Sequence, residues 1–355
     1  MTARPFRVRV LSSYIYPHDN VPHRDMGRNN RWFHGFVRSL TRHGSGLRDF
    51  DLEFVRLPQP PATLGDIAGA FVGSGVQLVI CLGTDAVLRW SDACREIPTL
   101  YCGAHPENHG LEVITHPHVT GVRLNLPLVW SFENFSLLQA LLPDLRDVFI
   151  PLNLDSEFAF PGVRANYEVF RRHHDTSWIT GPSTHLGYRS VYFLANRLGC
   201  RYHEGPFADL AELTRLLDDI PPGTTSALVG FNDVLLCDGA HRVALDAVRD
   251  RHLPLFWINN VPIVTAGGVA DFSSDFEAVG ERLGDMALRI LRDEVPVRDI
   301  SFAEDPGERL TLNLRRCEEL GITADADVRK RFHRVLAMTG GESGGRTIAA
   351  SLRSR

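Results

Sequence analysis

A cysteine and a histidine stand three residues apart in the segment Tyr101-Cys102-Gly103-Ala104-His105. A thiol and an imidazole can act as nucleophile and base when both side chains enter one cavity. Asp85, which follows another apolar run, is a further candidate acid–base group. Free cysteines are among the most frequently buried residues, so a buried strand position is favoured for Cys102. We expect His105 to contact a ligand by hydrogen bonding rather than to act as a base.

Two predicted strands and a helix position these residues. The apolar run Val76–Leu82 is typical of a strand that is buried on both faces. The turn Gly83-Thr84-Asp85 ends this run, and its Thr or Asp can cap a helix over Ala86–Glu96. Thr99–Cys102 begins the next strand. Ligands bind beyond the carboxyl ends of the strands in open parallel sheets, so both loops of this βαβ unit predict a site.

The alternation of strand and helix continues along the chain, which favours α/β architecture with parallel sheets. A chain of 355 residues is too long for one compact core, and the pattern restarts near Gly121–Pro127. We therefore expect two lobes. A later helix, Phe276–Arg292, and a strand, Ile300–Ala303, are also predicted. Polar residues at the predicted strand ends of the second round are further candidates: Asn153, Ser183 and Thr184.

A loop of about 19 residues, Ser12–Asn30, separates the first predicted strand from a helix over Arg31–Arg42. Most strand–helix loops are much shorter. The loop contains Tyr14, Tyr16 and Arg28. One interpretation is a lid that brings aromatic faces and cations to the sheet edge. The other is a surface loop with incidental charges.

Composition excludes several classes of function. Hydrophobic residues make up 44% and charged residues 23%, as in soluble globular proteins. The net charge of −5 is spread without blocks, so no nucleic-acid partner is expected. The six cysteines lack CxxC spacing. No pair among the clustered histidines His105, His109, His116 and His118 has the helical i, i+4 geometry of a zinc site, so we expect neither a metal nor a cofactor. No span approaches the roughly 18 apolar residues of a membrane helix, and membrane insertion is not expected.

Seven short motifs occur in a fixed order along roughly Val76–Ile322. They are Gly83-Thr84-Asp85-Ala86, Ile97-Pro98 with Ala104-His105-Pro106, Val119-Thr120-Gly121-Val122, Leu141-Leu142-Pro143, Leu253-Pro254-Leu255-Phe256, the helix Gly280–Leu291, and Asn313-Leu314 with Leu320-Gly321-Ile322. In this order they resemble the substrate-binding proteins of ABC transporters of the tryptophan/tyrosine type. That family has the type 1 periplasmic-binding fold.

The resemblance implies two Rossmann-like lobes with parallel sheets, joined by a three-crossover hinge and closing around a small molecule. It implies an N-terminal lobe of residues 1–122 plus 262–295 and a C-terminal lobe of residues 123–260 plus 296–334. The Gly/Ser-rich residues 335–355 are expected to be a disordered tail. The expected ligand contacts, from the resemblance and from the predicted strand ends and loop together, are Tyr14, Tyr16, Arg28, Gly83, Thr84, Asp85, Cys102, Ala104, His105, Asn153, Ser183, Thr184, Asn232, Asp233, Asn259 and Asn260.

The chain departs from the family at positions that bear on the ligand and on location. His105 stands where the family has the acidic residue of its Asp-Pro step, and Asn259 or Asn260 replaces its hinge aspartate. Fewer acids and more arginines near the cleft favour an anionic ligand. Arg7 and Arg9 interrupt any apolar signal core, and no lipobox cysteine is seen, so a cytoplasmic location is expected. An ABC permease would be the partner of an exported form.

Two functions from different classes fit these observations. The first is a solute-binding or sensor-type protein, monomeric or homodimeric, that binds a small polar, anionic or amino-acid-like metabolite. The alternative is a cytoplasmic enzyme of specialised metabolism on the same fold, with the interlobe cleft as active site. Its candidate catalytic residues would be Cys102, His105 and Asp85. The fold alone does not decide between them.

Overall fold

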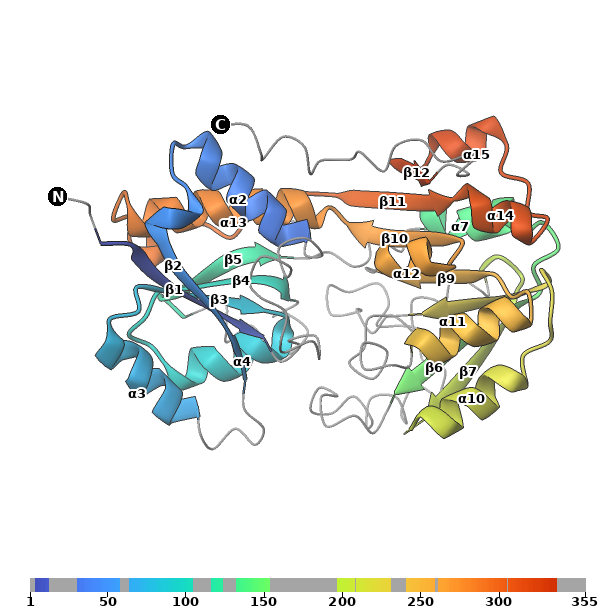
Figure 1. The fold of residues 1–355 in the computed structure, drawn as a ribbon, viewed down its shortest axis with the longest axis horizontal. Helices are drawn as coiled ribbons and strands as arrows, with labels where there is room; N and C mark the ends of the chain where they lie inside the picture. The colour runs from blue at the N-terminus through green and yellow to red at the C-terminus, as the bar shows by residue number, and fades with distance from the viewer. Residues whose placement is uncertain are drawn as a thin grey trace.

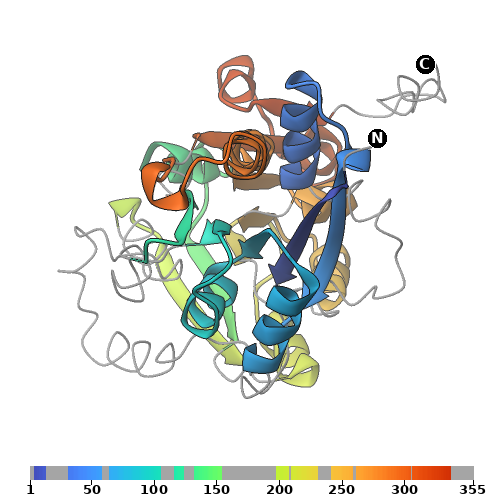
Figure 2. The same ribbon diagram turned by 90° about the vertical axis from the view of Figure 1, so that its left-hand side faces the viewer.

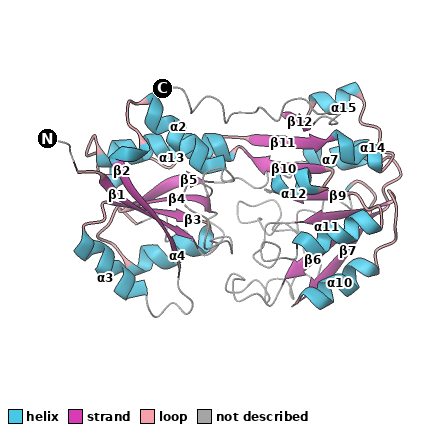
Figure 3. Ribbon diagram, viewed as in Figure 1, coloured by secondary structure: helices cyan, strands magenta, loops and turns pink. Residues whose placement is uncertain are grey.

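The computed structural model shows two α/β lobes, each built on a mostly parallel sheet with helices on its faces (Figures 1 and 3). This confirms the predicted fold class. The structure describes residues 4–12, 31–57, 64–104, 116–123, 132–153, 197–207, 209–230, 241–258, 261–304 and 306–336. The predicted tail, apart from its first two residues, and nearly all of the long loop after the first strand lie outside these ranges.

The first sheet has five parallel strands in the order β2-β1-β3-β4-β5. The apolar run that predicted β3 is buried along almost its whole length. Helices α3 and α4 cover one face, and α2 and α13 cover the other. The bounds are β1 Phe6–Ser12, α2 Arg31–Arg42, η1 Leu47–Asp49, β2 Phe50–Arg56, α3 Leu64–Ser74, β3 Leu78–Leu82, α4 Thr84–Ala93, β4 Thr99–Ala104, β5 Val119–Arg123, α13 Phe276–Leu291 and η6 Val297–Asp299.

The second sheet has seven strands in the order β12-β11-β10-β9-β8-β6-β7. The described strands pair in parallel except for β10 and β11, so β11 and β12 run opposite to the other five. Helices α10 and α11 pack on one face, α7, α14 and α15 on the other, and α12 packs against β9, β10 and β11. The bounds are α7 Phe132–Leu141, β6 Asp147–Asn153, β7 Arg201–Phe207, α10 Leu210–Asp218, β8 Ser226–Gly230, α11 His241–Asp250, β9 Leu255–Ile258, α12 Val261–Ala266, β10 Ala270–Ser274, β11 Glu308–Asn313, α14 Leu314–Glu319, α15 Ala326–Lys330 and β12 Arg334–Leu336.

The crossovers between the lobes differ from the predicted boundaries. The chain leaves the first sheet after Arg123, returns between β10 and α13, and leaves again between Glu304 and β11. The prediction places residues 262–275 in the first lobe, but β10 pairs with β9 and β11 of the second sheet. It places residues 297–303 in the second lobe. They stay with the first, because Ala303 bridges Val122 and the Thr120 hydroxyl donates to the Ile300 carbonyl. The predicted strand Ile300–Ala303 is therefore a single bridge.

Helices α2 and α13 lie side by side with their backbones in close contact (Figures 1 and 2). Three glycines permit this approach. A methyl group on Gly35 would overlap the Glu277 carbonyl oxygen, and one on Gly280 would overlap the Trp32 carbonyl oxygen. A methyl group on Gly284 would lie 2.6 Å from the Ser39 Cβ atom. The interface therefore accepts only glycine at these positions without a shift of one helix.

Gly280→Ala is expected to lower the free energy of unfolding by about 1–3 kcal/mol or more, because the added methyl group meets rigid backbone. Gly69→Ala is the matched control, since Gly69 lies in α3 and a methyl group added there would have no heavy atom within 4 Å. It should raise stability by about 0.5–1 kcal/mol through helix propensity. Urea unfolding followed by circular dichroism checks both. Equal effects of the two substitutions would contradict the close contact.

Candidate functional site

The carboxyl edges of the two sheets face each other. In Figure 1, the arrows of β3, β4 and β5 point toward the second lobe, and the parallel strands around β6 point back toward the first. The strand ends gather at these facing edges as the βαβ pattern predicts. The first lobe presents Gly83 and Ala104, and the second presents Asn153 and Gly230. This interlobe face is the candidate functional site.

Gly83 fixes the most informative turn at this face. Its N–H donates to the Cys102 carbonyl at 2.8 Å, and its φ of 86° is in the left-handed region that glycine favours. Helix α4 starts directly after it, so Gly83 is the N-cap and the predicted cap at Thr84 or Asp85 is wrong. Glycine has no side chain to accept hydrogen bonds from the first turn. The backbone N–H groups that begin α4 therefore lie at the sheet edge, where they suit an anion or a carbonyl group.

Cys102 lies in the core of the first lobe and not at its edge. Its residue is 2% exposed, and it packs in the cluster formed by β1, β3, β4, α2 and α13. Burial raises the pKa of the Cys102 thiol to about 12, so the thiolate needed for nucleophilic attack does not form near neutral pH. The structure gives Cys102 the buried strand position that the sequence favours. A side chain buried in this position is suited neither to catalysis nor to contact with a ligand.

The other predicted contacts divide into two groups. The backbones of Thr84, Asp85, Ala104 and Asn153 lie at the ends of their elements on the facing edges. The remaining predicted contacts lie outside the described residues: Tyr14, Tyr16, Arg28, His105, Ser183, Thr184, Asn232, Asp233, Asn259 and Asn260.

A cluster of charged residues at the junction of the lobes was missed by the sequence interpretation. We call it the hinge cluster: Arg31 and Arg38 on α2, Asp271 on β10, Asp275 and Glu277 at the start of α13, and Arg309 on β11. Asp275 caps α13 by accepting from the N–H groups of Glu277 and Ala278. The fully buried Asp271 accepts a hydrogen bond from the Ser273 hydroxyl.

The charges within the hinge cluster shift one another's protonation. Burial lowers the pKa of Arg31, and the positive charge of Arg309 lowers it further, against the opposite effect of Asp271 and Asp275. Burial would raise the pKa of Glu277. The hydrogen bond from Arg309 and the charges of Arg38, Arg309 and Arg31 outweigh that effect, so this pKa lies below its ordinary value. Glu277 is therefore ionised at neutral pH and held by cations.

One sequence signal could have located part of the hinge cluster. Along β10, Ala270 and Phe272 alternate with Asp271 and Ser273, and this period of two indicates a strand with one polar face. The polar face is buried rather than solvated. A buried acid on a strand next to a crossover is the kind of residue that marks a functional junction.

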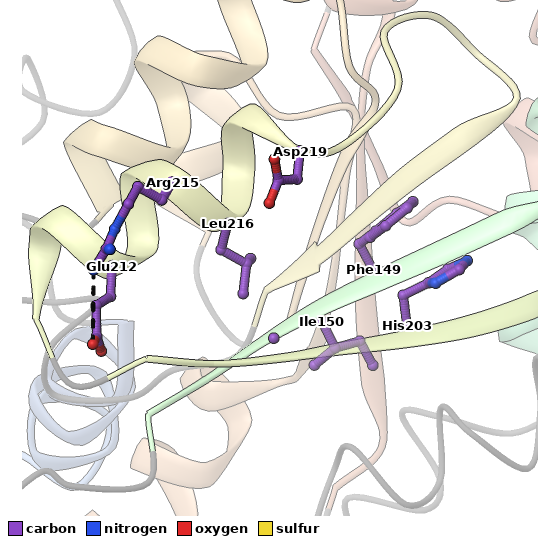
Figure 4. Close-up of a pocket in the computed structure, with 8 residues that line it drawn as sticks. Phe149, Ile150, His203, Glu212, Arg215, Leu216 and Asp219 are labelled. Carbon is purple, nitrogen blue, oxygen red and sulfur yellow. Dashed lines mark ion pairs between the residues drawn. The ribbon is translucent and has the colours of Figure 1, made fainter.

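A separate pocket of about 590 Å³ lies in the second lobe between α10 and strands β6 and β7 (Figure 4). The rings of Phe149 and His203, which are among its lining residues, stack with their centroids 4.4 Å apart. His203 Nε2 lies 2.6 Å from Asp147, and Glu212 pairs with Arg215 at 3.8 Å. Phe149 and His203 come from the first halves of their strands. The pocket is therefore distinct from the facing carboxyl edges.

A metal centre or a membrane-spanning helix would indicate a different type of functional site. Among the described residues, no three His, Cys, Asp or Glu side chains come together as a metal centre would require. Within the same part of the chain, every helix is too short or too polar to span a bilayer.

The two lobes, their mostly parallel sheets and the crossovers define the type 1 periplasmic-binding-protein fold. No protein-family model and no curated protein matches the sequence. Solved structures with this fold match almost the whole chain. A conserved domain protein from Vibrio cholerae has a TM-score of 0.67 and 17% identity, with 94% of this chain and 100% of that chain covered.

Two other solved structures are of proteins described by their binding of small molecules or substrates. An ABC domain from Streptococcus pneumonia in complex with L-Trp has a TM-score of 0.64 and 16% identity, covering 93% of this chain and 100% of that chain. The ligand-free, open structure of a substrate-binding protein with adhesive properties from Clostridium difficile has a TM-score of 0.60 and 17% identity, covering 93% and 99%. At these identities the likeness establishes the fold.

Cys102 is expected to resist alkylation in the native protein, because its thiol is buried and its pKa is raised. Iodoacetamide at about pH 8 followed by peptide mass mapping should leave Cys102 unmodified without denaturant and modify it in urea. Val72→Cys on the exposed face of α3 is the control for a reactive thiol. Fast native labelling of Cys102 at the rate of that control would overturn its assignment to the core.

Arg309→Gln is expected to change how stability depends on pH. The pKa of Glu277 is depressed in the folded state, so its stabilisation is present above its ordinary value of about 4.5 and is lost as the pH falls through the folded pKa. The variant should be less stable at neutral pH and lose less stability on acidification below about pH 4.5. Arg48→Gln removes an exposed pair at 4.0 Å and should leave the profile unchanged. Parallel profiles for Arg309→Gln and the wild type would refute the assigned interaction.

Proposed function

We propose that the protein binds a small polar metabolite, anionic or amino-acid-like, between its lobes as a solute-binding or sensor-type protein. One observation supports this above the others: the carboxyl edges of two parallel sheets face each other across a three-crossover hinge. Ligands of open α/β sheets bind at such edges. Two edges on a hinge can enclose a ligand from both sides.

The structural likenesses support the same class of function. The Streptococcus pneumonia domain holds L-Trp, and the Clostridium difficile protein is described as a substrate-binding protein. We extend to this chain the general property, which is binding of a small molecule by a two-lobed protein. The aromatic ligand is not extended to this chain, because His105, and either Asn259 or Asn260, stand where the family that the sequence resembles has acidic residues.

The anionic character of the ligand is proposed from the start of α4. The turn at Gly83 leaves the first backbone N–H groups of a ten-residue helix at the facing edge, without an N-cap side chain to satisfy them. Oriented N–H groups and the helix dipole both favour negative charge there. A carboxylate or phosphate group of the ligand would complete these hydrogen bonds.

A non-catalytic role is favoured over the enzyme. The sequence offers Cys102 as the nucleophile for that alternative, and its thiol lies in the core of the first lobe with a pKa of about 12. Binding requires only two edges complementary to the ligand and a hinge between them. The facing carboxyl edges and the crossovers of the described chain support that role.

A thermal-shift screen of amino acids, carboxylates and phosphorylated metabolites is expected to find a stabilising compound. A ligand at 100 times its Kd should add about 2.7 kcal/mol to the free energy of unfolding. Mass spectrometry of the same mixtures should recover the compound unchanged. Turnover of the compound would favour the enzyme instead, and the absence of any stabilising compound would count against the proposal.

Ala104→Trp tests the location of the site. Ala104 ends β4 at the facing edge, so a tryptophan there should reduce affinity for the compound found in the screen by about tenfold or more, which is about 1.4 kcal/mol. Ala70→Trp on the exposed side of α3 is the matched control and should bind like the wild type. Isothermal titration calorimetry measures both. Unchanged affinity of Ala104→Trp would move the site elsewhere.

A further inference from the structure

Glu277 is held by arginines from both lobes. Arg309 Nη1, on β11 of the second lobe, lies 2.6 Å from its Oε2 atom. Arg38 Nη2, on α2 of the first lobe, lies 2.5 Å from its Oε1 atom. The Glu277 side chain is 20% exposed and that of Arg309 is 35% exposed, so bulk water screens this pair only in part. The Glu277 carboxylate therefore joins the two lobes, and the longer contacts of Asp275 with Arg31 and Arg309, at 4.0 and 3.5 Å, lie beside it.

Glu277 moves with the first lobe. It lies in the first turn of α13, whose backbone contacts α2 through Gly35, Gly280 and Gly284. The backbone oxygen of Glu277 is itself part of that contact, because it lies where a methyl group on Gly35 would be. A rigid helix pair therefore fixes the Glu277 carboxylate relative to the first sheet.

Arg309 moves with the second lobe, because β11 pairs with β10 and β12 of that sheet. Two of the crossovers that join the lobes run beside this pair: one leads from β10 into α13, and the other leads into β11. The Asp275 N–H in the first donates to the Gly307 carbonyl in the second at 2.8 Å. The hinge is therefore short. A rotation of the second lobe changes the distance between Arg309 and Glu277 more directly than it changes contacts inside either sheet.

We propose that the Arg309–Glu277 ion pair is an interlobe latch that stabilises the lobe orientation seen here against other orientations of the hinge. Its role in admitting a ligand rests on the proposed function, but the latch itself acts without a ligand. The pair supplies the differential contact that any shift between two conformations requires. When the latch opens, Arg38 remains 2.5 Å from Glu277, so the carboxylate is not left buried and unpaired. This makes the latch reversible.

The test measures interlobe distance in the ligand-free protein. Spin labels on Val72→Cys and Ala211→Cys, both exposed, report the distance between α3 and α10 by double electron–electron resonance. Cys237→Ser removes the one cysteine that lies outside the described residues, and the five others are buried. In this background, Arg309→Gln is expected to raise the ratio of the minor to the major distance population by about fivefold or more.

Two controls separate the latch from general destabilisation. Arg201→Gln removes a 2.8 Å ion pair with Asp147 inside the second lobe and should leave the distances unchanged. Glu277→Gln should reproduce the shift, and adding it to Arg309→Gln should produce little further change. If Arg309→Gln fails to fold, Glu277→Gln with the same labels is compared with Arg201→Gln instead. Wild-type distances in the Arg309 or Glu277 variants, or an equal shift in Arg201→Gln, would overturn the latch. If the Arg309 and Glu277 variants show the distance shift but no compound from the screen binds the wild-type protein, the proposed function alone is contradicted.

Discussion

The close contact between α2 and α13 is the constraint on which the rest of the structure depends. Gly35, Gly280 and Gly284 allow two helices, separated by more than 200 residues in sequence, to meet backbone to backbone. Their shared apolar face then covers one side of the first sheet. Because α13 enters this contact directly after β10 of the second sheet, the same packing sets where the chain passes from one lobe to the other.

The site follows from this constraint. A fixed α13 holds Asp275 and Glu277 at the junction, where cations from both lobes reach them. The edge of the first sheet, with the turn at Gly83, faces the second sheet across that junction. Rigid packing within each lobe and a short hinge between the lobes are the two properties that ligand enclosure needs. Both arise from contacts between residues that are distant in sequence.

The sequence predicts elements well where apolar periodicity is strong. The bounds of α2 match the prediction, because Trp32, Phe33, Phe36 and Leu40 form one buried stripe. It fails at β10, whose polar face is buried, and at the N-cap of α4, which depends on the backbone angle of Gly83. Apart from the alternation along β10, local patterns could not predict the hinge cluster, since Arg38 and Glu277 are 239 residues apart. Pairing across such a distance is a property of the fold and not of any segment.

Hydrogen exchange with and without the compound identified by the screen tests the central claim, that a ligand binds between the facing edges. Binding between the lobes should slow exchange in peptides from both sheets at once: those around Gly83 and Ala104 in the first lobe and those around Asn153 and Gly230 in the second. Peptides of α3 and α15, far from these edges, should not change. Protection confined to one lobe, or to the pocket around His203, would contradict the account.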